Sequence, residues 1–288
     1  MGSFEDHLEY MTSQDKFYDF CLWEYEPLAP YESKFRPVNL LFHTFDVAGA
    51  NERIFEIIQA IRKGIGVSNT VWGVKQIGQV LSWEFYFYDY RREGRERSIS
   101  KLLNILKPFT SCGIKANHHY FMFSIDFDND LISGDRELDE IHMYIGNPGS
   151  TVSSGICYSL TDRAPRLENF YFFFDAEKDL EDIIGKTTSS AHLDSAGIDI
   201  DQILWPKMKG CRVIVVANKQ RNDAVYFSGI DIDQLIFFLK QMNYPDEIVS
   251  FAEKNRSRLD HLQFDAGFDY RMEEGNLRIL KSGYYGIF

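Results

Sequence analysis

The stretch from Leu81 to Tyr90 places the strongest constraint on how this chain can fold. Its sequence, Leu-Ser-Trp-Glu-Phe-Tyr-Phe-Tyr-Asp-Tyr, alternates two kinds of side chain with a period of two residues. Because successive side chains of a β-strand point to opposite faces, Trp83 and two phenylalanines share one face, and Glu84 shares the other with tyrosines. We therefore predict a strand between an apolar layer and a partly polar, aromatic-lined interior, such as the inside of a wide barrel. The alternative is an amphipathic strand with its tyrosines at a wet surface.

The rest of the chain predicts four more hairpins of the same kind. Segments with β-strand periodicity come in pairs separated by turns or polar loops, and most pairs precede a segment with helical periodicity. The predicted strand pairs are 70–76 with 82–90, 120–127 with 138–145, 155–160 with 168–174, 212–218 with 223–228, and 262–270 with 276–285. The helices that follow are expected at 97–106, 177–184, 231–241 and 246–255. The Gly-rich stretch 146–155 cannot form a helix, so the second hairpin lacks one.

The domain organisation follows from the absence of a linker. No linker-like Pro/Gly/Ser run divides the 288 residues, so we expect a single domain over 1–288. Residues 1–64 are expected to form a helical and extended N-terminal part, with a helix around 17–23, a strand at 38–46 and a helix at 51–63. Residues 65–288 then contain the repeated hairpins and helices.

The hairpins also predict which residues face inward. If they close into a barrel, helices will cover its outside, so the apolar face of each strand should point outward and the mixed face inward. The inner residues are then Glu84, Tyr86 and Tyr88, followed by His142 and Tyr144, Asn169 and Tyr171, and Tyr226 and Ser228. The predicted fold class is α+β, a ten-stranded antiparallel β-barrel ringed by helices in α-β-β-α repeats.

This arrangement resembles the aromatic prenyltransferases with an α-β-β-α barrel, also called ABBA prenyltransferases. The resemblance covers about residues 65–288 and depends on the hairpin order and the inner tyrosines, without a short diagnostic motif. In that family the barrel encloses a chamber whose tyrosines shield an allylic carbocation, and positive residues at one end hold the diphosphate. The resemblance implies transfer of a dimethylallyl or geranyl group from its diphosphate to an aromatic secondary metabolite, with an indole as the expected acceptor.

The resemblance also implies roles for individual residues. Glu84 would be the catalytic carboxylate, although family members often carry it on the preceding strand, where this chain has Trp72-Gly73-Val74-Lys75. Tyr86 and Tyr88 would line the aromatic pocket, and Arg278 is a further candidate cation. The residues implied to bind diphosphate and shield the cation are Lys75, His142, Tyr144, Tyr171, Arg212, Tyr226, Lys281, Tyr284 and Tyr285.

The resemblance leaves the cofactor open between none and Mg²⁺. A diphosphate is strongly anionic, so either basic side chains or a metal ion must balance its charge. The acidic run that ends the strand at 120–127 offers Asp126 and Asp128 as Mg²⁺ ligands. The alternative is that these acids are simply solvated at a strand end before a turn.

Composition restricts the partners and the compartment. The net charge of −12 and the lack of a basic face argue against nucleic acid, so the expected partners are an allylic diphosphate and an aromatic small molecule. Aromatic residues make up 15% of the chain, which favours a pocket for a flat or apolar ligand. No apolar run is long enough to cross a bilayer, and four cysteines without metal-ligand or redox spacing indicate a reducing, cytoplasmic location.

Two other functions are compatible with the same sequence. The first is a non-catalytic carrier that holds a flat apolar ligand in a dry, uncharged, aromatic-lined barrel. The second is an open-sheet interaction protein in which the missing helix after Gly146 leaves an edge strand for a partner. An enzyme differs from both because its basic residues must meet at one end of the chamber, with Glu84 deeper inside.

Overall fold

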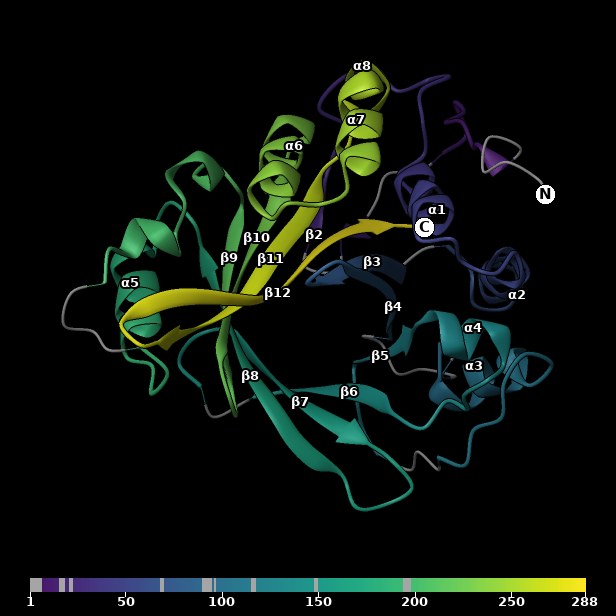
Figure 1. The fold of residues 1–288 in the computed structure, drawn as a ribbon, viewed down its shortest axis with the longest axis horizontal. Coiled ribbons are helices and arrows are strands. Elements are labelled where there is room, and N and C mark those ends of the chain that lie inside the picture. The colour runs from purple at the N-terminus through teal and green to yellow at the C-terminus, as the bar shows by residue number, and fades with distance from the viewer. Residues whose placement is uncertain are drawn as a thin grey trace.

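Ten antiparallel strands close into one barrel (Figure 1). The computed structural model describes residues 7–15, 19–20, 23–67, 70–89, 95, 97–114, 118–147, 150–193 and 198–288, with the backbone alone at 19–20 and 23–24. The barrel strands are β3 (Thr70–Ile77), β4 (Val80–Tyr88), β5 (Met122–Phe127), β6 (Ile141–Gly146), β7 (Ser154–Leu160), β8 (Arg166–Asp175), β9 (Val213–Lys219), β10 (Asp223–Ile230), β11 (Phe264–Glu273) and β12 (Asn276–Ile287). Each strand pairs with the strands before and after it, and β12 pairs with β3.

This closed barrel confirms the predicted fold class. All ten predicted strands are present, within a few residues of their expected bounds. The open-sheet alternative is wrong, because β6 pairs along its length with β7, from Ile141 opposite Leu160 to Gly146 opposite Gly155. The strand that was expected to present a free edge therefore has its backbone groups satisfied inside the barrel.

Helices surround the barrel on its outside (Figure 1). They are α1 (Val38–Val47), α2 (Arg53–Ile65), α3 (Ile99–Leu106), α4 (Asn129–Ser133), α5 (Leu180–Thr188), α6 (Ile232–Gln241), α7 (Asp246–Lys254) and α8 (Arg256–Leu259), with short 3₁₀ turns at Ile200–Gln202 and Pro206–Met208. The described residues between β6 and β7, 147 and 150–153, form no helix, as the glycine-rich sequence predicted.

The apolar strand faces point outward against these helices, as the alternation in the sequence predicted. Trp72, Trp83, Phe85 and Phe87 are fully buried in the layer between sheet and helices. The indole nitrogen of Trp83 donates a hydrogen bond of 2.8 Å to the hydroxyl of Thr44 on α1. Because this outer layer forms the main core, the inside of the barrel is free to carry polar groups.

Two N-terminal predictions are wrong. The segment expected as a strand at 38–46 is helix α1, and seven of its ten side chains are buried, among them Leu41 and Phe45. A run that buries most of its side chains shows only a weak period, so periodicity does not separate a helix from a strand there. The helix expected around 17–23 is contradicted where the chain is described, since β1 (Asp19–Phe20) and β2 (Trp23–Glu24) pair as antiparallel strands. Residues 17, 18, 21 and 22 lie outside the described residues.

Candidate functional site

Five tyrosines form a closed ring inside the barrel, one on every second strand. They are Tyr86 on β4, Tyr144 on β6, Tyr171 on β8, Tyr226 on β10 and Tyr285 on β12. The centroids of consecutive aromatic rings lie 6.3, 6.0, 6.4, 6.3 and 5.9 Å apart, and the last distance joins Tyr285 back to Tyr86. The structure therefore brings together, in one layer, tyrosines that the sequence spreads over about 200 residues.

Glycines on the neighbouring strands make room for this ring. A Cβ atom at Gly73 on β3 would lie 2.6 Å from the ring of Tyr285, and one at Gly267 on β11 would lie 2.3 Å from the ring of Tyr226. Both distances are far inside van der Waals contact. The tyrosine rings thus lie directly over backbone, a geometry that only residues without a side chain permit.

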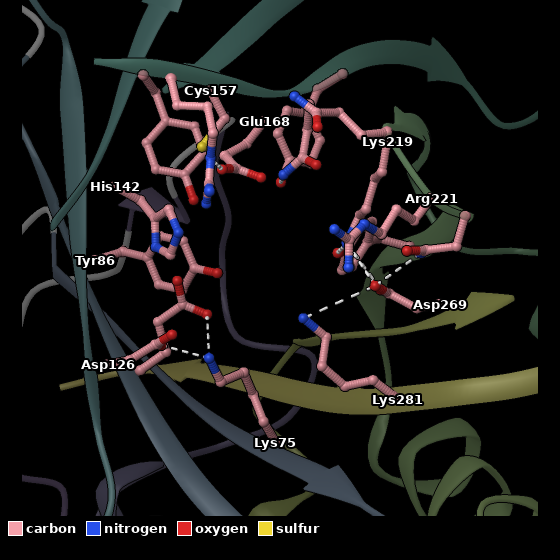
Figure 2. A pocket seen from close by; sticks show the side chains of 18 of the residues that line it. Lys75, Tyr86, Asp126, His142, Cys157, Glu168, Lys219, Arg221, Asp269 and Lys281 are labelled. Atoms are coloured by element: carbon pink, nitrogen blue, oxygen red, sulfur yellow. Dashed lines mark hydrogen bonds and ion pairs between the residues drawn. The ribbon is translucent and has the colours of Figure 1, made fainter. Parts of the chain in front are cut away.

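A cavity of about 380 Å³ lies next to the tyrosine ring, and its lining is rich in charge. This volume falls within the usual range for small-molecule sites. Figure 2 shows two groups of charged side chains that face each other across the cavity. The charged and ionisable lining residues are Lys75, Glu84, Asp126, His142, Arg166, Glu168, Lys219, Arg221, Asp269 and Lys281.

The first group, which we call the acidic wall, consists of Lys75, Glu84, Asp126 and His142 from β3, β4, β5 and β6. The Lys75 ammonium lies 3.4 Å from a carboxylate oxygen of Glu84 and forms a close ion pair with Asp126. The hydroxyl of Ser124 donates a hydrogen bond of 2.7 Å to the other oxygen of Glu84. Two carboxylates therefore share a single lysine, which leaves the acidic wall with a deficit of positive charge.

These contacts fix the ionisation of Glu84. Burial opposes the charged form, but the Lys75 ammonium, together with His142, Lys281 and the Ser124 hydroxyl, outweighs it and lowers the pKa of Glu84 to about 2. Burial and the charge of Glu84 instead raise the pKa of Asp126. The predicted catalytic carboxylate thus lies inside the chamber, as expected, and is ionised near neutral pH.

The opposite group, which we call the basic wall, consists of Lys219, Asp269, Lys281 and Arg221. Lys219 Nζ lies 2.9 and 2.8 Å from the two carboxylate oxygens of Asp269, whereas Lys281 Nζ lies 3.9 Å from the nearer one. Asn222 Nδ2 donates a further hydrogen bond of 3.0 Å to Asp269. Burial and the neighbouring Lys219 ammonium lower the pKa of Lys281. Two lysines therefore share one carboxylate, and the basic wall has an excess of positive charge.

The hydroxyl groups of the tyrosine ring are neutral hydrogen-bonding groups. Burial raises the pKa of all five tyrosines well above the ordinary value. The Tyr144 hydroxyl lies 3.3 Å from Ser124 Oγ, the Tyr171 hydroxyl accepts a hydrogen bond of 3.0 Å from Asn169, and the Tyr226 hydroxyl lies 3.4 Å from Lys219 Nζ. The ring therefore connects to both walls through its hydroxyl groups.

Two tyrosines that were predicted to face the ligand do not line the cavity. Tyr284 is on the outer face of β12, where its ring lies 5.9 Å from Trp72 and 5.4 Å from Tyr244. The prediction for Tyr284 is therefore wrong, since only one of two adjacent strand residues can point inward. Tyr88 does point inward, but it packs against the apolar residues Val71 and Met122 and is absent from the cavity lining.

The charged residues Arg212, Arg278 and Asp128 also lie outside the cavity. Arg212 is exposed just before β9, and its backbone N–H donates to Ser228 O at 2.8 Å. Arg278 is exposed on β12 and pairs with Glu273 at 3.0 Å. Asp128 caps α4 through the backbone N–H of Leu131 and pairs with Arg136 at 3.0 Å. None of the three is among the residues that line the cavity.

Sequence reasoning missed most of the basic wall. The turn predicted between 218 and 223 includes Lys219, whereas Val215, Ala217 and Lys219 continue the alternation of β9 by one inward residue. Asp269 lies on β11, the first strand of its hairpin, whereas the predicted inward residues lie on second strands. Arg221 follows in the β9–β10 turn. Extending the alternation along first strands would have found Lys219 and Asp269, but the turn residue gives no such signal.

The residues present do not fit the Mg²⁺ ion that the family resemblance allows. Glu84, Asp126 and His142 offer ligand atoms that all lie within 4.8 Å of one another, which is a reasonable spacing for a cation site. However, the Lys75 ammonium contacts both carboxylates. A divalent ion bound to the same oxygens would lie against an ammonium group, which is strongly repulsive.

Comparison with known proteins does not assign this chain to a family. The sequence matches no protein-family model and no curated protein. Within the described residues, none of the helices has the length and apolar character required to span a lipid bilayer. The fold alone is consistent with an α-β-β-α barrel.

Proposed function

We propose that this protein transfers an allylic group, dimethylallyl or geranyl, from its diphosphate to an aromatic acceptor, with an indole as the expected acceptor. The observation that carries the proposal is the closed ring of five tyrosines directly beside a wall with surplus positive charge. This reaction needs both features together, because it releases an anion and creates a cation in the same chamber.

The basic wall supports binding of the diphosphate. Lys219 and Lys281 share Asp269, and Arg221 lines the same side of the cavity (Figure 2). Lys281 makes the longest ion pair of the three cavity lysines, and burial together with repulsion from Lys219 lowers its pKa, so an anionic ligand would offset both effects. The donor is therefore proposed to place its diphosphate on Lys281, which the sequence predicted among others, and on Lys219 and Arg221, which it did not predict.

The tyrosine ring supports stabilisation of the allylic cation. When the carbon–oxygen bond to the diphosphate breaks, the positive carbon requires electron-rich surfaces and exclusion of water. A desolvated cation–π contact contributes about 2 kcal/mol, and the ring offers five aromatic faces or edges around one space. The neutral tyrosine hydroxyls remain available as hydrogen-bond donors to the departing phosphate oxygens.

The acidic wall supports the last step. After the aromatic carbon of the acceptor attacks the allylic carbon, the ring carbon carries a proton that must leave to restore aromaticity. Glu84 is ionised and lines the chamber opposite the basic wall, so it is the proposed acceptor of that proton. The carrier alternative receives less support, because it requires a dry and uncharged lining and this cavity has ten ionisable side chains other than tyrosine and cysteine.

The test is calorimetric titration with a non-hydrolysable dimethylallyl thiodiphosphate, with and without Mg²⁺. We expect micromolar binding to the wild type and at least a tenfold loss in Lys281→Met, equivalent to about 1.4 kcal/mol. Arg212→Met is the matched control, since it also removes one positive charge but lies outside the cavity. No binding heat from folded wild-type protein would contradict the proposal, as would equal losses in both variants. Incubation with dimethylallyl diphosphate and indole acceptors, followed by mass spectrometry, tests the transfer itself.

A further inference from the structure

The acidic wall has the composition of a metal site, yet a lysine occupies it. Glu84, Asp126 and His142 come from three adjacent strands, and their ligand atoms lie within 4.8 Å of one another. Two carboxylates and one imidazole at this spacing are a donor set that divalent transition-metal ions such as Mn²⁺ accept. A positive charge among these donors is favourable, because the buried carboxylate of Glu84 and the partly exposed carboxylate of Asp126 repel each other.

Lys75 supplies that positive charge. Its side chain is 9% exposed, and its ammonium group bridges Glu84 and Asp126, as the dashed lines in Figure 2 show. The position of the ammonium is set by the barrel itself, because β3 pairs on one side with β12 and on the other with β4, which carries Glu84. The lysine therefore reaches the carboxylates from a neighbouring strand of the closed sheet, on a backbone that cannot easily move away.

We propose that Lys75 is a resident cation that occupies a latent divalent-metal site formed by Glu84, Asp126 and His142. While the ammonium is present, the metal is excluded by charge and by the carboxylate oxygens already engaged. One consequence depends on the proposed function: if the diphosphate binds at the basic wall, it does so without a divalent ion. The lysine thus performs structurally what a bound metal would otherwise do for these carboxylates.

The proposal makes a specific prediction for one substitution. Lys75→Met removes the ammonium and keeps a side chain of similar length, which leaves the three donors available to a cation. We expect Mn²⁺ to bind this variant at one equivalent and at least tenfold more tightly than it binds the wild type. Lys219→Met is the matched control, because it removes a lysine that is buried to a similar extent. Its partner, Asp269, does not belong to any group of three possible metal ligands among the described residues.

The measurement is titration of purified full-length protein with Mn²⁺, followed by the electron paramagnetic resonance signal of the free ion. Lys75→Met should bind one equivalent, and His142→Ala in the same background should lose at least tenfold in affinity. Thermal denaturation provides a second readout, since Mn²⁺ should raise the melting temperature of Lys75→Met and leave that of the wild type and Lys219→Met unchanged. Lys75→Gln is the second variant, with the same expectations, should Lys75→Met not fold.

Two results would overturn the proposal. One is stoichiometric Mn²⁺ binding to the wild type that His142→Ala weakens, because then Lys75 excludes nothing. The other is a folded Lys75→Met or Lys75→Gln protein without any gain in Mn²⁺ affinity. Neither result depends on a diphosphate, so the outcome is separate from the calorimetric test of the proposed function. If that function holds, a chelator should leave thiodiphosphate affinity within about twofold of its value in Mg²⁺.

Discussion

The acidic and basic walls of the chamber contain the same kinds of charged group in opposite proportions. On the acidic wall two carboxylates, Glu84 and Asp126, share one lysine, Lys75. On the basic wall two lysines, Lys219 and Lys281, share one carboxylate, Asp269. The acidic wall therefore has one carboxylate more than its lysine balances, whereas the basic wall, which also includes Arg221, has two more positive groups than carboxylates.

This difference teaches how a protein with a net charge of −12 can hold an anion. The overall charge governs long-range attraction, but a buried site responds to the few groups whose charges are incompletely balanced nearby. Under the proposed function, the diphosphate of the allylic donor would bind at the basic wall, and a hydrogen-bond-donating group of the aromatic acceptor would bind across the cavity at the acidic wall.

The largest expected effect on stability is the difference between removing a lysine from the acidic wall and removing one from the basic wall. Lys75→Met should lower the free energy of unfolding by about 3 kcal/mol, because it leaves Glu84 buried beside Asp126 without a cation. Lys281→Met should change it by less than about 1 kcal/mol, in the stabilising direction, because it removes repulsion with Lys219. Urea denaturation at pH 7 measures both. Equal losses in the two variants would mean that the walls do not differ in charge balance.

The next effect concerns how the tyrosine ring packs against the strands of the basic wall. Gly267→Ala should cost about 2 to 3 kcal/mol, since the new methyl group would lie 2.3 Å from Tyr226 and 2.5 Å from the carbonyl oxygen of Val225. Gly113→Ala is the control, because no atom lies within 4 Å of the corresponding position. Thermal or urea denaturation compares the two variants. A loss in Gly113→Ala as large as in Gly267→Ala would show that the contact with Tyr226 is not the cause.

Asp265, whose hydrogen-bond partners are a hydroxyl and a backbone N–H, provides a further comparison with the lysine-paired Asp269. Asp265 and Asp269 share the inner face of β11, but the Ser228 hydroxyl and the Gly229 N–H are the partners of Asp265. Burial raises the pKa of Asp265 to about 7, whereas the nearby lysines overcome burial and lower that of Asp269. A raised carboxyl pKa means that the folded state binds the extra proton, so stability should fall as pH rises from about 4 to 7.

Asp265→Asn tests this pH dependence. The amide keeps an acceptor for Ser228 and Gly229 and removes the charge. Because Asp265 retains some solvent exposure, we expect a gain of about 1 to 2 kcal/mol at pH 8, which should vanish near pH 4. Asp269→Asn should instead destabilise the protein at pH 8, since Lys219 would lose its partner. Urea denaturation across this pH range distinguishes them, and a pH-independent effect of Asp265→Asn would contradict the raised pKa.

The smallest expected effect lies between the acidic wall and the tyrosine ring. Ser124→Ala should cost about 1 kcal/mol, because Ser124 donates to Glu84 at 2.7 Å and lies 3.3 Å from the Tyr144 hydroxyl. Ser282→Ala, which removes a hydroxyl 3.3 Å from Tyr244 on the outer face, should cost a similar amount. Only Ser124→Ala should alter acceptor turnover under the proposed function. A change in turnover in Ser282→Ala of the same size would indicate a general structural effect.

Local periodicity predicted the strands of the barrel and which of their faces point inward. The alternation around Trp83, Glu84 and Tyr86 predicted both the strand and its two faces, because a period of two residues has one structural meaning in a strand. Periodicity failed where most side chains are buried, as in α1, and where two neighbouring residues are of the same type. Tyr284 and Tyr285 are identical in sequence terms, and only the register against Val74 and Gly73 decides which one points inward.

The sequence by itself determined that the chain would form strand pairs with one apolar and one mixed face, and that most second strands would carry a tyrosine on the mixed face, since each strand encodes its own amphipathic pattern. Only the tertiary structure decided which charges meet. Lys75 and Asp126 are 51 residues apart, and Lys219 and Asp269 are 50 apart, and no local pattern links either pair. Their pairing depends on closure and register of the barrel, which bring the inner faces of distant strands around one cavity. Charge balance, and with it the proposed chemistry, is a property of that closure.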